Sequence, residues 1–229
     1  MPLEDYSKKR NFKNSPEPPA SSNELQENGR AQKYASVPGS KSAEDLAVAN
    51  NNLKFVIHKH FASHLHFDLR LELDGVLKSW AIPKGPTVNP KEKKLAVMVE
   101  DHPFEYRDFE GIIPEGNYGA GRVYIWDQGT YHALGTENRD ESEKLLREGL
   151  EKGHLTFILN GNVLKGEFAL IRLKKASPKD WLLIKKNDEY ASDMDVAKLE
   201  APDEASSHEE NSMPKKNFNG PRCDKSGTY

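Results

Sequence analysis

A nine-residue stretch of the chain alternates strictly between apolar and polar side chains. Leucine or phenylalanine occupies every odd position from Leu65 to Leu73, and histidine, aspartate, arginine or glutamate occupies every even position. Successive side chains of a β-strand point to opposite faces, so this period of two predicts a strand with one apolar and one polar face. The dipeptide Asp74-Gly75 follows directly and is typical of a tight turn into a second strand, Val76–Pro83.

Other short segments of the same kind predict a mainly β fold. They are Lys54–His58, Leu95–Glu100, Arg122–Trp126, Leu155–Leu159, Glu167–Leu173 and Trp181–Lys185. Residues 141–152 are predicted to form the one helix, capped by Asp140 and ended by Gly153. Many short strands with close turns predict a small closed or partly closed β-barrel with one short helix on the outside. The glycine-rich segment 111–121 is predicted to be a loop near the barrel mouth.

Composition divides the chain into four parts. Hydrophobic residues make up 36% and charged residues 30%, a low apolar share for a chain folded along its whole length. Residues 19–50 and 191–229 are polar and are predicted to be a flexible linker and a disordered tail. Residues 51–190 are predicted to form the barrel domain, and residues 1–18 a segment that lines its site.

Several classes of protein are excluded by what the sequence contains. Apolar runs are much shorter than the roughly 20 residues that cross a bilayer, and the first residues do not resemble a secretion signal. A single cysteine excludes a disulfide scaffold and a cysteine-rich zinc site. The net charge of -3 excludes a generally basic surface, so any contact with nucleic acid must be local. We therefore expect a cytoplasmic protein without a membrane partner.

Four of the eight histidines fall between His58 and His66. On the strand 65–73, His66, Asp68 and Arg70 project from the same face, about 6.5–7 Å apart along the strand. Imidazole and carboxylate donors suit a first-row divalent cation, and His60 lies close enough in sequence to supply a third ligand. An arginine beside such a cation favours a phosphate as substrate. The alternative is that these histidines lie on a solvated strand face without a metal.

Three further residues are candidates for the chemistry, although each also suits a surface position. His102 ends the strand that starts near Leu95, Tyr106 follows it within one turn, and Lys84 follows another strand. The basic residues between Arg172 and Lys186 suit either a solvated face or a groove for a nucleic-acid backbone.

Longer motifs carry a resemblance to a known family. They are Phe55–Gly75, Leu77–Pro86, Val99–Pro103, Phe109–Gly111 and Ile113–Gly121, preceded by Tyr6–Pro18. Together they resemble the 3′-phosphoesterase domain of bacterial and archaeal DNA ligase D. The similar regions, 5–18 and 51–187, cover about 151 residues. Since the chain contains no Lys-x-Asp-Gly nucleotidyl-transfer motif, the resemblance predicts a stand-alone version of this domain.

The resemblance implies a β-barrel with a polar cavity and a manganese-dependent activity that heals 3′ ends for non-homologous end joining. The enzyme would remove a 3′-terminal ribonucleoside and then the remaining 3′-phosphate, leaving a 3′-hydroxyl. It would act as a monomer on DNA or DNA/RNA ends of a primer-template duplex, with a ligase and a polymerase in trans, in association with the nucleoid.

The same resemblance assigns roles to residues. The metal ligands would be His60, His66 and Asp68. The catalytic residues would be Arg70, Lys84, Glu100, His102 and Tyr106, and the substrate contacts would be Arg10, Glu17 and Lys94. Two positions depart from the family pattern: Asn11 stands where an acidic residue is usual, and Lys94 where arginine is common. The second change replaces a bidentate fork with a point charge.

Two other functions remain open from the residues alone. Two histidines and a carboxylate also form the iron site of barrel-shaped oxygenases, which act on small molecules. A module that grips DNA ends without turnover would suit the polar tails and the lysine-rich strands.

Overall fold

The computed structural model describes residues 3–20, 52–174 and 177–204. The strands in these residues are β1 (Leu53–Phe61), β2 (Leu65–Leu73), β3 (Val76–Ile82), β4 (Lys93–Met98), β5 (His102–Pro103), β6 (Gly111–Ile113), β7 (Gly121–Ala133), β8 (His154–Gly161), β9 (Lys165–Arg172) and β10 (Asp180–Lys185). The helical elements are α1 (Glu4–Lys8), α3 (Arg139–Lys152) and the 3-10 turns η1 (Phe104–Asp108) and η2 (Val196–Lys198). In this part of the chain, none of the helices is long and apolar enough to cross a membrane.

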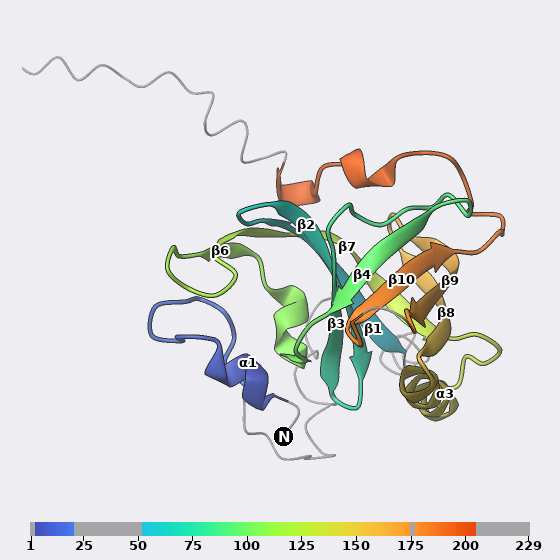
Figure 1. The fold of residues 1–229 in the computed structure, drawn as a ribbon, viewed down its shortest axis with the longest axis horizontal. Coiled ribbons are helices and arrows are strands. Elements are labelled where there is room, and N and C mark those ends of the chain that lie inside the picture. Colours follow the sequence, from blue (N-terminus) through green and yellow to red (C-terminus); the bar gives the residue numbers. More distant parts are fainter. Residues whose placement is uncertain (1–2, 21–51, 175–176, 205–229) are drawn as a thin grey trace, which may run out of the picture.

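Eight antiparallel strands form a closed barrel (Figure 1). They follow the order β1-β2-β3-β4-β10-β9-β8-β7, and β7 pairs with β1 to close the ring. The short strands β5 and β6 pair with β3 and β7 respectively, outside this ring. The predicted mainly β barrel is therefore confirmed. It carries the predicted helix α3 on the outside, and α1 is a further short helix that was not predicted.

Local sequence signals explain most of the turns. Asp74 and Gly75 both have positive φ, 55° and 76°, as a two-residue hairpin turn requires. Gly153 ends α3 in the left-handed conformation, as predicted. The predicted cap of this helix is wrong, because α3 begins earlier and the side chain of Asn138, not Asp140, accepts the hydrogen bond of the Glu141 amide.

The apolar face of β2 points into the barrel. Leu69, Leu71 and Leu73 are buried in one cluster that includes side chains from all eight barrel strands. Within this cluster the rings of Trp80 and Trp181 pack edge to face, with their centroids 5.9 Å apart. Since side chains alternate along a strand, the polar residues of β2 project from the outer wall of the barrel.

A second apolar cluster lies on that outer wall. It contains Tyr6, Leu77, Tyr106, Phe109, Ile113 and Val123. These residues come from the N-terminal segment, η1, β6 and the outward faces of β3 and β7. In Figure 1, α1 and β6 accordingly lie beside the barrel. The polar face of β2 therefore lies between the barrel wall and this outer layer.

The part of the chain that follows β10 also packs on the barrel. Val196 and Ala201 belong to the main apolar cluster, and a Cβ on Gly85 would lie 2.6 Å from the Cβ of Ala197. Lys59 and Glu204 form a buried ion pair of 2.7 Å. Packed structure thus continues to residue 204, beyond the predicted domain boundary at 190. Residues 21–51 and 205–229, which include most of the predicted linker and tail, lie outside the described residues.

Ending the chain at residue 190 is expected to destabilise the barrel. The shorter protein loses the burial of Val196 and Ala201 and exposes the core side chains that they cover, which costs about 3 kcal/mol. For a domain of this size the Tm then falls by about 5–10 °C. The measurement is thermal unfolding, with a chain that ends at residue 204 as the control. Equal Tm values for the two proteins would contradict this account of the segment.

Candidate active site

The hairpin of β1 and β2 brings together three side chains of the types that can ligate a metal. His60 lies directly opposite His66, and His58 lies opposite Asp68, so all four side chains share the outer face. The Nδ1 atom of His60 is 3.8 Å from one carboxylate oxygen of Asp68, and the Nε2 atom of His66 is 3.8 Å from the other. One donor atom from each of these three residues lies within 4.8 Å of the others.

Backbone hydrogen bonds orient the two imidazoles. His60 donates its Nε2 hydrogen to the carbonyl oxygen of Gly119 at 2.9 Å, and His66 donates its Nδ1 hydrogen to the carbonyl of His64 at 3.0 Å. Each ring therefore turns its other nitrogen toward Asp68. Histidine ligands of protein-bound metals commonly donate their second N–H in this way, so the donor set fits a divalent cation.

Arg70 places a fixed positive charge next to these donors. Its Nη2 donates to Asp68 at 3.2 Å, its Nη1 to the Ser79 hydroxyl at 3.0 Å, and its Nε to Nδ1 of His58 at 3.2 Å. Its guanidinium also lies 4.7 Å from the centroid of the Tyr106 ring. Burial opposes ionisation of Asp68, but Arg70 and the neighbouring histidines hold its pKa well below the ordinary value.

His58 is a site residue that the sequence reasoning did not select. It is fully buried, and burial together with the charge of Arg70 lowers its pKa to about 3. A neutral imidazole is the form that can accept the Arg70 hydrogen bond at Nδ1. Its position could have indicated this role: His58 lies two residues before His60, so on a β-strand both side chains project from the same face.

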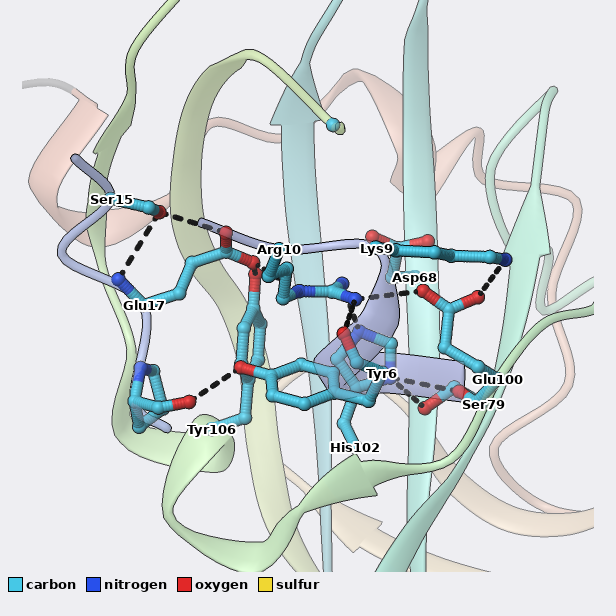
Figure 2. A network of polar contacts seen from close by, with 12 residues as sticks. Tyr6, Lys9, Arg10, Ser15, Glu17, Asp68, Ser79, Glu100, His102 and Tyr106 are labelled. Atoms are coloured by element: carbon cyan, nitrogen blue, oxygen red, sulfur yellow. Dashed lines mark hydrogen bonds and ion pairs between the residues drawn. The ribbon is translucent and has the colours of Figure 1, made fainter. Parts of the chain in front are cut away.

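The N-terminal segment adds a second arginine, Arg10 (Figure 2). Its Nε donates to Glu17 at 2.8 Å, its Nη1 to Glu100 at 2.9 Å, and its Nη2 to Nε2 of His102 at 3.0 Å. Lys9 pairs with the other oxygen of Glu100 at 2.9 Å. Although burial opposes ionisation of Glu100, the hydrogen bonds from Lys9 and Arg10 lower its pKa. This network joins α1 to the barrel wall.

His102 is buried and neutral. It donates its Nδ1 hydrogen to the Glu100 carbonyl at 2.9 Å, which leaves Nε2 as the acceptor for Arg10. Burial, and then the charges of Arg70 and Arg10, lower the pKa of His102 well below the ordinary value. Its ring packs 4.8 Å from the ring of Tyr106.

Tyr106 connects η1 to the N-terminal segment. Its hydroxyl donates to Glu17 at 3.1 Å, and Ser15 donates to the second oxygen of Glu17 at 2.8 Å. Burial raises the pKa of Tyr106 well above the ordinary value, so it remains a hydrogen-bond donor at neutral pH.

These residues surround one cavity of about 260 Å³. Nine of the eleven predicted site residues line it: Arg10, Glu17, His60, His66, Asp68, Arg70, Glu100, His102 and Tyr106. Lys84 and Lys94 do not line it. Lys84 is exposed in the turn after β3, and Lys94 pairs with Glu92 at 2.8 Å. Asn11 is also outside this lining, and its side chain accepts from the Lys13 amide at 3.2 Å.

The predicted basic groove is not supported at Lys185. The side chain of Lys185 is fully buried and pairs with Asp188, so it is not available to a nucleic-acid backbone. The cavity lining also includes Tyr118 from the loop after β6, and Ser79 of β3 bonds Arg70. Both residues lie within motifs quoted above, but neither was selected as a site residue.

The sequence of this chain is similar to those of known proteins. A sequence profile described as the DNA ligase D 3′-phosphoesterase domain matches residues 58–172. The multifunctional non-homologous end joining protein LigD of Pseudomonas aeruginosa is 44% identical over 195 residues, which cover 85% of this chain and 20% of the relative. Its namesake in Mycolicibacterium smegmatis is 41% identical over 160 residues, 70% of this chain and 20% of that protein.

A third relative extends the comparison. The multifunctional non-homologous end joining DNA repair protein LigD of Mycobacterium tuberculosis is 45% identical over 125 residues, 55% of this chain and 15% of that protein. The matched region thus spans a fifth or less of the length of each of these relatives. The profile match covers half of the present sequence and includes β2, with its polar face, and β5, which carries His102. The chain therefore belongs to the DNA ligase D 3′-phosphoesterase family.

Proposed function

We propose that this protein is a manganese-dependent phosphoesterase that heals DNA 3′ ends. Family membership supports a phosphoesterase activity in DNA end repair. The finer proposal is that it first removes a 3′-terminal ribonucleoside and then the 3′-phosphate that remains. The observation that carries this proposal is the meeting of His60, His66 and Asp68 beside Arg70 in one cavity.

In both reactions water attacks a phosphorus atom that is bonded to the 3′ oxygen of the retained primer end. In the first, water attacks the diester phosphorus, the bond to the 5′ oxygen of the terminal nucleoside breaks, and that oxygen takes up a proton. In the second, water attacks the remaining monoester, the bond to the 3′ oxygen breaks, and inorganic phosphate leaves. Both substrates present non-bridging oxygens whose negative charge must be stabilised in the transition state.

The residues of the chain suit these needs. His60, His66 and Asp68 would hold the cation, which supplies Lewis-acid stabilisation of the phosphate charge when bound. Arg70 is held by three hydrogen bonds and so presents its charge without reorganisation. His102 can exchange a proton with a substrate oxygen at Nε2, the atom that accepts from Arg10 in the absence of substrate. Tyr106, Glu17 and Glu100 orient Arg10 and thereby the site.

The direct test uses a duplex primer-template whose primer ends in two ribonucleotides. With manganese, we expect a product that is shortened by one nucleoside and carries a 3′-phosphate, followed by a 3′-hydroxyl product. Chelation of the metal is expected to stop both steps. If manganese, magnesium, zinc and cobalt all failed to support either step, the proposal would be contradicted.

The same assay separates the other two functions. An oxygenase would need molecular oxygen and would leave the duplex intact, whereas hydrolysis proceeds under argon. A module that only grips ends would bind the duplex equally well when Asp68 is replaced and would release no product. The engagement of Arg70 with Asp68 at 3.2 Å favours the phosphoesterase, because a guanidinium beside a divalent cation suits a phosphate better than a small neutral substrate.

Replacing Lys84 or Lys94 with alanine is expected to weaken binding of the duplex rather than to slow the chemistry. Both ammonium groups lie outside the cavity lining, so we propose that they contact phosphates away from the scissile one. For each variant, KM should rise a fewfold and kcat should stay within about twofold. The slope of the logarithm of the binding constant against the logarithm of the salt concentration should fall by about one. A fall in kcat at unchanged KM would contradict this assignment and place the lysine at the reacting phosphate.

We further propose that the protein works as a monomer in the cytoplasm, close to the nucleoid, with a ligase and a polymerase acting in trans. The names of its relatives support a setting in non-homologous end joining. The substrate class, a 3′ end on a DNA or DNA/RNA duplex, follows from the same support.

A further inference from the structure

The rim of the cavity carries one exposed aromatic ring, that of Tyr118. This residue lies in the loop between β6 and β7, lines the cavity, and is 49% exposed. Tyr106 lines the same cavity but is only 2% exposed and holds Glu17 and Arg70. Of the two tyrosines that line this cavity, Tyr118 is thus the one whose ring is exposed to solvent.

The loop holds Tyr118 close to the proposed metal ligands. The carbonyl of the next residue, Gly119, accepts the 2.9 Å hydrogen bond from His60. Asn117, on the other side, donates from its backbone and its side chain to the Pro114 carbonyl at 3.3 and 3.0 Å. Where the loop joins β7, a Cβ on Gly121 would lie 2.3 Å from the carbonyl oxygen of Phe61, so only glycine permits this approach.

Two cations orient the tyrosine ring. The Nζ of Lys9 lies 4.8 Å from the ring centroid, and the guanidinium carbon of Arg10 lies 5.7 Å from it. Both cations are themselves tied to Glu100. Attraction between these charges and the ring limits its rotation, so the ring is a prepared surface rather than a freely moving side chain.

We propose that Tyr118 forms the subsite for the terminal nucleoside by stacking on its base. This inference rests on the proposed function, which places the scissile phosphate among Asp68, Arg70 and His102. In the first reaction the terminal nucleoside is attached to that phosphate, so its base lies within one nucleotide length of the cavity and meets the rim. Stacking on tyrosine accepts any base, as an enzyme that trims ends of arbitrary sequence requires.

The subsite distinguishes the two reactions. The diester substrate has a nucleoside beyond the scissile phosphate, and the 3′-phosphate substrate has none. Tyr118→Ala is therefore expected to lower kcat/KM about tenfold or more on the ribonucleotide end, mainly through KM, and to leave kcat/KM on the 3′-phosphate end within about twofold. Tyr118→Phe, which keeps the π face, is expected to retain both activities.

An abasic terminal ribose on the same duplex tests stacking itself. The wild-type protein should lose about as much on the abasic end as Tyr118→Ala loses on the normal end, and the variant should not distinguish the two ends. Tyr190→Ala is the matched control, because Tyr190 is 48% exposed and lies outside this cavity lining. It should behave as wild type on every substrate.

Other outcomes would overturn the inference. Equal losses on the ribonucleotide and 3′-phosphate ends would mean that Tyr118 serves the shared phosphate site. An unchanged preference for a normal over an abasic end in Tyr118→Ala would mean that the base is bound elsewhere. In both cases the wild-type protein is active and only the subsite is rejected. A wild-type protein inactive on both ends would instead contradict the proposed function.

Discussion

Replacing Asp68 with alanine is expected to abolish manganese binding at this site and to reduce both reactions by about a thousandfold or more. Asp68 is the centre of the donor set, since its two oxygens face the two imidazoles at 3.8 Å each. Without the carboxylate, the donor set has no negative charge to offset that of Arg70, and such a site repels a divalent cation. A loss of several kcal/mol of transition-state stabilisation corresponds to this factor.

The measurement combines manganese titration by calorimetry with rates on both substrates. Because Asp68 also accepts a hydrogen bond from Arg70, Asp68→Asn is the second variant: it keeps an oxygen acceptor and the shape of the side chain but removes the charge. It should fold as wild type does and still bind manganese weakly. Asp140→Ala, an exposed acidic residue at the start of α3, is the control and should match wild type. Normal manganese affinity and normal rates in Asp68→Ala would disprove the assignment of this metal site.

The sequence allowed the central hairpin to be predicted because its information is local. A period of two over nine residues defines a strand and its two faces, and the Asp74-Gly75 turn sets the pairing of β2 with β3. Once His66, Asp68 and Arg70 share a face, their proximity follows from strand geometry alone. The involvement of His60 required only that β1 return antiparallel to β2, which the short connection between them enforces.

The sequence did not show whether the site lies inside or outside the barrel wall, because that depends on tertiary packing. An alternating strand in a barrel can turn its polar face inward to a cavity or outward to solvent, and the pattern of β2 is compatible with both. The outcome depends on whether seven other strands supply enough apolar side chains to fill the interior, as Trp80, Trp181 and Phe168 do. The outer layer that converts the wall into a cavity comes from residues remote in sequence, such as Tyr6 and Tyr106.

Long-range side-chain contacts explain the remaining differences between the sequence-based predictions and the structure. Composition alone suggested a polar tail from residue 191, yet Glu204 reaches Lys59, 145 residues away along the chain. Similarly, Arg10 contacts Glu100 and His102 across 90 and 92 residues. Such contacts leave no periodic signal. Conversely, Lys84 lies within one of the family motifs and Lys94 lies close to another, yet neither lines the cavity.

Replacing His102 with alanine is expected to separate metal binding from turnover. His102 contributes no donor to the proposed metal set, so manganese affinity should remain within about threefold of wild type. Both reactions should nevertheless slow by about a hundred- to a thousandfold, the usual contribution of a residue that transfers a proton to or from a reacting oxygen. In this proposal the buried Nε2 atom, 3.0 Å from Arg10, would exchange the proton.

The same manganese titration and rate assays used for Asp68 measure this effect, now with the opposite expectation for binding. His102→Gln serves as the second variant: it keeps a polar side chain in the buried position but cannot be protonated, so it should fold normally and remain slow. His154→Ala, which replaces an exposed histidine on β8, is the control and should match wild type. A loss of manganese affinity in His102→Ala equal to that in Asp68→Ala would make His102 a metal ligand. Full activity in either His102 variant would exclude it from proton transfer, and Arg70 and the cation would then have to account for the chemistry without an acid or base at this position.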